Sequence, residues 1–348
     1  MSFSEVENKL KVIIAGPSIV GGGSEKVKML NIFLRSIGHQ VEVVSMPGHT
    51  IEGKAWYYYQ RARARINGHE ERHMKKTADF LEKRVRKMGC DALICVETPF
   101  SYVLTRDLGC LKIFSCEALA DELYFSKDFS DLERFRKLRK MELEIIMKSD
   151  YVLFPWETTK NYVRKYIWRG NNLITVRHGC NPSKKRASYY FPPSIVSLGY
   201  LAHSYSNKEL LSYLTRLSPY RIDVYGTYKP PRKFAINFKG FAPSMDVLSN
   251  YQFGLNTISK DIFRQNHFSS RVLAYLSYGL PALSPDWMNF SNSLKGVLPY
   301  NEDNFIEVVE EYLDFEKWTM MSDAAYQQAL ELDWREVLKP LQQIISPG

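Results

Sequence analysis

The sequence predicts an α/β protein of two domains, each built around a parallel sheet. Short apolar runs, typical of buried parallel strands, alternate along the chain with longer segments of helical periodicity. With 348 residues, 45% of them hydrophobic, the chain is too long for one average core and long enough for two. A polar, proline-bearing segment at residues 181–193 separates two stretches in which the alternation begins afresh.

The first half opens with a strand, a glycine-rich loop, a helix and a second strand. The apolar run Lys11–Gly16 indicates the central strand of a sheet, the helix is expected at residues 24–37, and the next strand at 40–45. The loop contains Gly21, Gly22 and Gly23. It lacks the Gly-x-Gly-x-x-Gly pattern of a redox dinucleotide site and the Gly-Lys-Ser/Thr of a Walker P-loop. It is either an ordinary connection or backbone that approaches a ligand closely.

Acidic side chains follow one of the later strands. Further strands are expected at residues 90–96, 111–116, 151–154 and 173–176, with helices at 132–148 and 157–169. Open α/β sheets bind ligands at the carboxyl ends of their strands. Glu117 follows the strand at 111–116 and is therefore a candidate general acid or base, with Asp121 and Glu122 as alternatives. These carboxylates could instead occupy the first turn of a helix, where the helix dipole favours negative charge.

Most of the net charge of +9 is concentrated in residues 51–87, which hold eleven basic and five acidic residues. Aromatic and arginine side chains gather at the start of this stretch, at Trp56, Tyr57, Arg61, Arg63 and Arg65. Such a mixture favours an anionic membrane surface. It could also stack bases and bind phosphates, or it could be a solvated helix.

The second half repeats the strand–helix pattern. Strands are expected at residues 194–199, 220–226, 236–240, 253–256 and 281–284, and several of them end in glycine. Lys208 begins a helix that ends near residue 217, residues 257–265 read as a long polar loop, and the tail from residue 305 to 345 is helical. Strands that end in glycine suggest backbone held close to one bound molecule.

The helix after residue 268 combines two hydroxyls and an arginine at its start. Ser269 or Ser270 is expected to cap it through a side-chain oxygen, Val272, Leu273, Tyr275 and Leu276 form its apolar face, and Gly279 ends it. Free N–H groups and the helix dipole favour an anion there, and a phosphate fits beside Arg271. The alternative is an ordinary cap with a surface arginine.

The remaining composition favours a protein of the cytoplasm. The cysteine count is five, an odd number, and no Cys-x-x-Cys pair occurs, so reduced thiols are expected rather than disulfides or a zinc site. The first residues are polar, and no apolar run approaches the ~20 residues of a membrane span. Any membrane contact is therefore expected to be peripheral, on the inner face.

The order of short motifs resembles the GT-B glycosyltransferases, and in particular glycosyltransferase family 4. The matching segments are Gly21–Glu25, Val176–Asn181, Ser197–Leu201 with Lys208, Val224–Gly226, Phe238–Phe241, Arg271–Leu283 and Leu332–Arg335. The sequence of the helix before Pro281 also resembles the corresponding segment of bacterial exopolysaccharide glucuronosyltransferases. The resemblance implies two Rossmann-like domains that face each other across a cleft: residues 1–185 for the acceptor, 190–320 for the donor, and a C-terminal helix, 321–348, that packs back on the first domain.

The resemblance also implies a reaction and a set of site residues. A nucleotide-diphosphate sugar of the UDP or GDP type would donate its sugar to a glycan or lipid-linked acceptor without a cofactor; no Asp-x-Asp metal motif occurs. Glu117 and Asp121 are the catalytic candidates. Lys208, His267, Ser269, Ser270 and Arg271 would bind the diphosphate, Tyr200, Gly226, Thr227, Gly240 and Phe241 the base and ribose, and the Gly21–Gly23 loop the acceptor.

The chain also departs from the family pattern. Retaining members have Glu-x7-Glu before the Gly-x-Pro turn, whereas the corresponding segment here, which includes His267 and Ala274, contains no glutamate. Tyr200 replaces the arginine of Val-Gly-Arg-Leu. An inverting enzyme with Glu117 as its base is therefore favoured. Two alternatives stay open: a nucleotide-sugar 2-epimerase, which needs no acceptor, and a nucleic-acid-binding module. Nucleic acid is not an expected partner, because the basic excess is local whereas glycine-ended strands recur.

Overall fold

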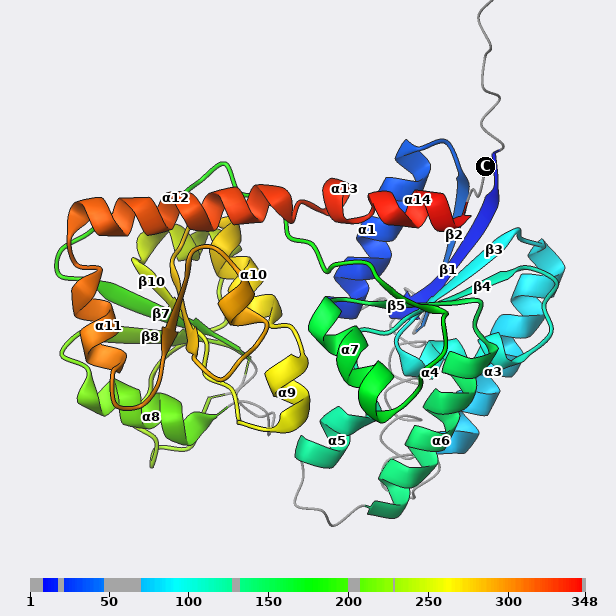
Figure 1. The fold of residues 1–348 in the computed structure, drawn as a ribbon, viewed down its shortest axis with the longest axis horizontal. Coiled ribbons are helices and arrows are strands. Elements are labelled where there is room, and N and C mark those ends of the chain that lie inside the picture. Colours follow the sequence, from blue (N-terminus) through cyan, green and yellow to red (C-terminus); the bar gives the residue numbers. More distant parts are fainter. Residues whose placement is uncertain are drawn as a thin grey trace, which may run out of the picture. The chain divides into compact units, whose positions relative to one another are not determined.

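The computed structural model describes residues 9–17, 22–46, 70–126, 132–199, 207–227 and 229–345. The chain divides into two compact units: unit 1 comprises Met1–Arg177 with Val337–Gly348, and unit 2 comprises His178–Glu336. Each unit contains one six-stranded parallel sheet with helices packed around it (Figure 1), which confirms the predicted α/β class. The boundary between the two units lies between Arg177 and His178, slightly before the linker predicted at residues 181–193.

Unit 1 begins with the strand at the middle of its sheet. Its elements are β1 (Lys11–Pro17), α1 (Gly22–Ser36), β2 (Gln40–Met46), α3 (Glu70–Met88), β3 (Ala92–Val96), α4 (Thr98–Ser101), η1 (Tyr102–Thr105), β4 (Leu111–Ser115), α5 (Ala120–Ser126), α6 (Leu132–Lys148), β5 (Tyr151–Phe154), α7 (Glu157–Tyr166), β6 (Leu173–Thr175) and α14 (Lys339–Ile345). The strand order is β2-β1-β3-β4-β5-β6. The chain leaves β1 toward one edge and returns to its other side, so the topological switch point lies between β1 and β3.

The core of unit 1 lies on both faces of this sheet. All five residues of β3 are buried, as are Val12–Ala15 of β1, because helices cover the sheet on either side. Figure 1 shows α1 and α14 over one face and α3 and α6 over the other. This explains why the strands read as continuous apolar runs rather than alternating ones.

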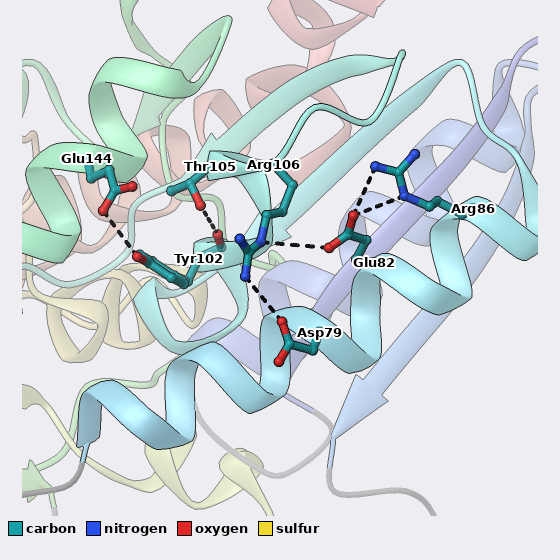
Figure 2. Close-up of polar contacts among 7 residues, drawn as sticks. All are labelled: Asp79, Glu82, Arg86, Tyr102, Thr105, Arg106 and Glu144. Carbon is teal, nitrogen blue, oxygen red and sulfur yellow. Dashed lines mark hydrogen bonds and ion pairs between the residues drawn. The ribbon is translucent and has the colours of Figure 1, made fainter.

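Polar contacts join α3, η1 and α6 at the surface of unit 1 (Figure 2). Arg106, just after η1, places Nη2 3.1 Å from Asp79 Oδ1 and Nε 3.7 Å from Glu82 Oε2, both on α3. The Tyr102 hydroxyl donates to Glu144 Oε2 of α6 at 3.1 Å. These partly exposed contacts fix the lateral position of helices whose apolar sides are already buried.

Unit 2 has the same plan. Its elements are β7 (Ser194–Leu198), α8 (Lys208–Leu217), β8 (Arg221–Tyr225), β9 (Asn237–Gly240), η2 (Met245–Asn250), β10 (Phe253–Leu255), α9 (Ile262–Asn266), α10 (Ser270–Ser277), β11 (Ala282–Pro285), η3 (Ser291–Ser293), β12 (Val297–Tyr300), α11 (Phe305–Glu311), α12 (Phe315–Glu331) and α13 (Trp334–Val337), the last of which ends one residue into unit 1. The strand order is β12-β11-β10-β7-β8-β9, so the switch point of this sheet lies between β7 and β10.

The helix α9 contradicts the predicted polar loop at residues 257–265. The Asp261 side chain accepts a hydrogen bond from the Arg264 N–H at 2.8 Å and so caps a helix that begins at Ile262. Phe263, buried beneath it, anchors the turn to the core. The prediction was wrong because an acidic cap and one buried ring suffice for a short helix that shows no extended apolar periodicity.

Candidate functional site

Three glycines meet at the carboxyl ends of β7, β8 and β9 in unit 2. The Gly199 N–H donates to the Tyr225 carbonyl at 3.0 Å, and the Gly226 N–H donates to the Gly240 carbonyl at 2.8 Å. A Cβ atom on Gly226 would lie 2.0 Å from the Gly199 carbonyl oxygen, so only glycine permits this approach. Gly240 has φ +83°, which also favours glycine. The recurrent strand-ending glycines therefore belong to one edge of one sheet.

Arg271 lies at the switch point of unit 2. It stands in the first turn of α10, and its Nη1 donates to the Thr257 carbonyl, just beyond β10, at 3.2 Å. A Cβ atom on Gly199, just beyond β7, would lie 3.4 Å from the same Nη1. The guanidinium thus contacts the ends of both strands that border the switch point, where open α/β sheets bind their ligands.

The prediction that a serine side chain caps α10 is wrong. Ser269 is the N-cap residue, but the helix has no side-chain cap hydrogen bond. The buried Ser269 hydroxyl donates instead to Asn256 Oδ1 at 3.4 Å, and Asn256 Nδ2 donates to Ser284 Oγ at 3.1 Å. Ser269 therefore belongs to a buried polar network that joins α10 to β10 and β11. Ser270 is exposed on the first helical position.

The other predicted donor-side residues are spread over unit 2. His267 follows α9, and its ring stacks on Phe263 with 4.8 Å between centroids. Lys208 is the first residue of α8, a helix capped by the Asn207 side chain, which accepts from the Leu210 N–H at 2.9 Å. Thr227 and Phe241 are exposed at the ends of β8 and β9. The structure brings Arg271 and Ser269 to the same helix tip, and Gly226 and Gly240 to the neighbouring strand ends.

Several predicted residues lie outside the part of the chain that the structure describes. They are Gly21 of the glycine loop, Tyr200, and the basic-aromatic group Trp56, Tyr57, Arg61, Arg63 and Arg65. Gly22 and Gly23 are described and begin α1.

In unit 1, Glu117 lies just beyond the carboxyl end of β4, as predicted from the sequence. Its side chain is 7% exposed. The Ser115 hydroxyl donates to Glu117 Oε1 at 3.0 Å, and Lys26 Nζ of α1 is 3.9 Å from the same oxygen. Burial lowers the pKa of Lys26, and the charge of Glu117 partly offsets that effect. A buried amine and a buried carboxylate therefore face each other at the carboxyl edge of this sheet, the edge at which open α/β sheets in general bind ligands.

Glu97 is a second carboxylate at this edge and is absent from the residues predicted above. It follows β3 at the switch point of unit 1, and it is the one non-glycine residue with positive φ in the described part of the chain, at φ 69° and ψ 146°. A Cβ atom on Gly23 would lie 2.0 Å from Glu97 Oε1, so this carboxylate rests against the backbone at the start of α1. The rule that selected Glu117, an acid just after a strand, also applies to Glu97.

Asp121 occupies a different setting, between helices. The Tyr162 hydroxyl of α7 donates to Asp121 Oδ1 at 2.7 Å, and the Arg139 guanidinium of α6 forms an ion pair with the same carboxylate. Arg139 also donates to Glu142 Oε2 at 2.7 Å. Burial raises the pKa of Glu142 to about 7. Asp121 therefore takes part in a buried network that joins α5, α6 and α7.

Three further properties concern the described residues as a set. They contain no group of three or more His, Cys, Asp or Glu side chains that could hold a metal ion. Among these residues, too, no helix combines the length and apolar character needed to cross a bilayer. All five cysteines are described, and none of them forms a disulfide.

The overall backbone is similar to that of several solved glycosyltransferase structures. Sucrose-phosphate synthase from Thermosynechococcus elongatus aligns with a TM-score of 0.74 at 12% identity, over 97% of this chain and 98% of that one. The lipopolysaccharide outer core galactosyltransferase WaaB aligns with a TM-score of 0.65 at 14% identity, over 96% and 99%. An alpha-glucosyltransferase in complex with UDP aligns with a TM-score of 0.62 at 11% identity, over 97% and 100%.

The chain has the GT-B fold. This confirms the fold family that the order of motifs suggested. Neither a family model nor the sequence of a curated protein matches the chain. At identities of 11–14%, these similarities show the fold but do not show which residues act in the site. The role of each site residue is therefore argued from its geometry in this structure.

Proposed function

We propose that this protein is a glycosyltransferase that moves a sugar from a nucleotide-diphosphate sugar of the UDP or GDP type to an acceptor hydroxyl. The observation that carries the proposal is the position of Arg271, whose guanidinium lies at the switch point between β7 and β10. A planar cation with several donors at a helix N-terminus is well matched to a diphosphate. The fold supports the same function, and one structure with that fold is an alpha-glucosyltransferase in complex with UDP.

In this proposal unit 2 binds the donor. Arg271 and Lys208 neutralise the charge that develops on the leaving diphosphate, and Ser270 and the first N–H groups of α10 donate hydrogen bonds to it. The Ser269 hydroxyl, which donates to Asn256, holds the start of α10 in place. His267 lies next to the donor sugar. The glycine-ended strands β8 and β9, with Thr227 and Phe241, receive the base and ribose together with Tyr200.

Unit 1 binds the acceptor and supplies the base. The acceptor hydroxyl oxygen attacks the anomeric carbon, the bond from that carbon to the diphosphate breaks, and Glu117 takes the hydroxyl proton. A general base of this kind contributes about 10²–10⁴-fold. One displacement inverts the anomeric configuration. We expect the reaction to need no metal, because the sequence has no Asp-x-Asp motif and the proposal assigns the neutralisation of the diphosphate to Arg271 and Lys208. Asp121 is the weaker candidate, because its oxygens are engaged by Arg139 and Tyr162.

A thermal-shift panel of nucleoside diphosphates and their sugars tests the donor assignment. A diphosphate at 100 times its Kd should stabilise the native fold by about 2.7 kcal/mol, and the Arg271→Gln variant should lose most of that stabilisation. Arg216→Gln, on the exposed last turn of α8, is the matched control and should keep it. A panel in which no nucleotide raises the melting temperature of the native protein would contradict the proposal.

A Glu117→Gln variant tests the catalytic assignment. It removes the proton acceptor but keeps the shape, so turnover should fall by about 10²-fold or more while nucleotide binding stays unchanged. The readout is transfer from a radiolabelled donor to an acceptor. Full turnover in Glu117→Gln together with loss in Glu97→Gln would move the base to Glu97. Conversion of the nucleotide sugar without any acceptor would favour the epimerase alternative instead.

We also propose that the acceptor is a glycan or a lipid-linked sugar at the cytoplasmic face of the membrane. The support is compositional: eleven basic residues and an aromatic cluster lie within residues 51–87. Each cation near an anionic surface contributes about 1 kcal/mol. The protein should sediment with vesicles that contain anionic lipid at low salt, and replacing Arg61, Arg63 and Arg65 with glutamine should release it. Absence of binding at low salt would remove this part of the proposal.

A further inference from the structure

The hydroxyl of Tyr275 lies between two strands at the switch point of unit 2. The pairing of β7 with β10 ends at Val196 and Gly254. Just beyond that point, the Leu198 N–H donates to the Tyr275 hydroxyl at 2.9 Å, and the hydroxyl donates to the Leu255 carbonyl at 3.1 Å. One phenolic oxygen therefore bridges the two strands where their direct ladder stops.

The ring of Tyr275 is built into the sheet. The side chain is completely buried, and a Cβ atom on Gly254 would lie 2.3 Å from ring atom Cγ. The ring thus occupies the space that any side chain on residue 254 of β10 would need. Burial raises the pKa of Tyr275 to about 12, so the hydroxyl keeps its proton and its donor role at neutral pH.

The same helix carries the arginine assigned to the diphosphate. Arg271 stands four residues before Tyr275 on α10, one turn away on the same side of the helix. Its guanidinium contacts the Thr257 carbonyl after β10 and approaches Gly199 after β7. The two residues therefore contact the same pair of strand ends, Tyr275 at Leu198 and Leu255, and Arg271 one or two residues further on, at Gly199 and Thr257.

We propose that Tyr275 is a positioning residue of the nucleotide-diphosphate site, an inference that rests on the proposed function. Its hydroxyl holds the ends of β7 and β10 apart, at the separation at which the Gly199 backbone and Arg271 receive the diphosphate. A direct hydrogen bond between the Leu198 N–H and the Leu255 carbonyl would bring those atoms to about 2.9 Å and close the gap. Tyr275 does not itself touch the ligand.

The test is nucleotide binding by Tyr275→Phe. The phenyl ring keeps the packing on Gly254 but leaves a buried donor and a buried acceptor without the bridging oxygen, so the strand ends must shift or admit water. We expect the Kd for UDP or GDP, whichever the native protein binds, to rise about tenfold by calorimetry. In turnover assays KM for the donor should rise more than kcat falls. Unchanged affinity in a folded variant would overturn the inference.

Tyr278→Phe is the matched control. Its hydroxyl also donates a hydrogen bond, to Asp246 Oδ1 at 3.0 Å, but Tyr278 is the C-cap residue of α10, at the opposite end of the helix from Arg271. It should lower the melting temperature and leave the Kd unchanged. An equal loss of affinity in both variants would mean that general destabilisation, not positioning, is responsible.

A double-mutant cycle separates positioning from direct contact. If Tyr275 acts through Arg271, the double variant should bind no more weakly than Arg271→Gln alone. Fully additive losses would overturn the inference. Hydrogen exchange at the Leu198 amide of the native protein gives a second measurement, which nucleotide binding should slow. A native protein that binds no nucleotide would refute the proposed function itself, and a native protein that binds while Tyr275→Phe binds equally would refute this inference alone.

Discussion

Glu97 illustrates how a single residue can conflict with its own backbone. At φ 69° and ψ 146° it occupies a region that is essentially confined to glycine, at a cost of about 1–3 kcal/mol. The carboxylate meanwhile rests against Gly23 at the switch point of unit 1. A strained carboxylate at this position indicates that the fold tolerates the cost for the sake of the side chain, which is why Glu97 is the second candidate after Glu117.

We expect Glu97→Gly to stabilise the protein. Removing Cβ relieves the strain, and this gain exceeds the roughly 0.5–1 kcal/mol that glycine loses in chain entropy. The midpoint of thermal unfolding should therefore rise by a few degrees, while transferase activity falls. Glu97→Ala is the matched control, because it removes the carboxylate but keeps Cβ, and it should give no gain. Equal midpoints for the two variants would contradict the strain argument.

Glu142 should make stability depend on pH. Burial raises its pKa to about 7, above the value near 4.5 of an unfolded chain, so the folded state holds the proton more tightly. Its contribution to stability is complete below about pH 4.5 and is lost as the pH rises through 7. Denaturant midpoints of the native protein and of Glu142→Gln between pH 4.5 and 8 check this. Their difference should change across that window, and a constant difference would contradict the prediction.

Two arginines of unit 1 each form ion pairs between neighbouring segments, but they should contribute differently to the free energy of unfolding. Arg139 of α6 is 19% exposed and pairs with Asp121 and Glu142, whose side chains are 9% and 0% exposed. Arg106, 41% exposed, pairs with Asp79 and Glu82 at the surface. Removing one partner of a buried pair leaves an uncompensated charge, whereas a surface pair is largely screened.

The expected result is a large contrast between two equivalent variants. Arg139→Met should lower the free energy of unfolding of unit 1 by about 3–5 kcal/mol, and Arg106→Met by about 1 kcal/mol or less. Urea titrations of both proteins give the comparison. Equal effects would mean that burial does not govern the contribution of these pairs, and that the connection between α5, α6 and α7 is no stronger than the one in Figure 2.

At the scale of the whole molecule, the C-terminal segment belongs to the unit that contains the N-terminus. Residues 337–348 group with unit 1, and α14 buries Leu341, Ile344 and Ile345. Burying an aliphatic side chain of this size contributes about 1.5–3 kcal/mol. The integrity of unit 1 therefore depends on a segment that is far away in sequence.

A chain that stops at Glu336 should lose stability in unit 1. Loss of five buried side chains, Val337 and Leu338 together with the three of α14, predicts faster hydrogen exchange in β1 and β3, while β7 and β10 of unit 2 exchange as before. A chain that stops at Ile345 retains α14 and serves as the control. Unchanged exchange in unit 1, or equal acceleration in both units, would contradict the prediction.

Local patterns predicted most of the elements but not the partners they bring together. Residues 132–148, 151–154 and 208–217 were predicted with the limits that α6, β5 and α8 have, because apolar periodicity and turn residues are local signals. The short helix α9 was predicted as loop, and the edge strand β12 was not predicted. The position of an acid just after a strand selects Glu117 and applies equally to Glu97, whereas the strained backbone of Glu97 is a signal that only the structure provides.

The sequence by itself determined the class of the fold, because buried parallel strands and their covering helices must alternate in a pattern that can be read along the chain. Only the tertiary structure decided that Gly199, Thr257, Arg271 and Tyr275 meet at one point. The order of strands within a sheet depends on contacts between distant segments, and no local pattern of residues specifies which strand ends become neighbours.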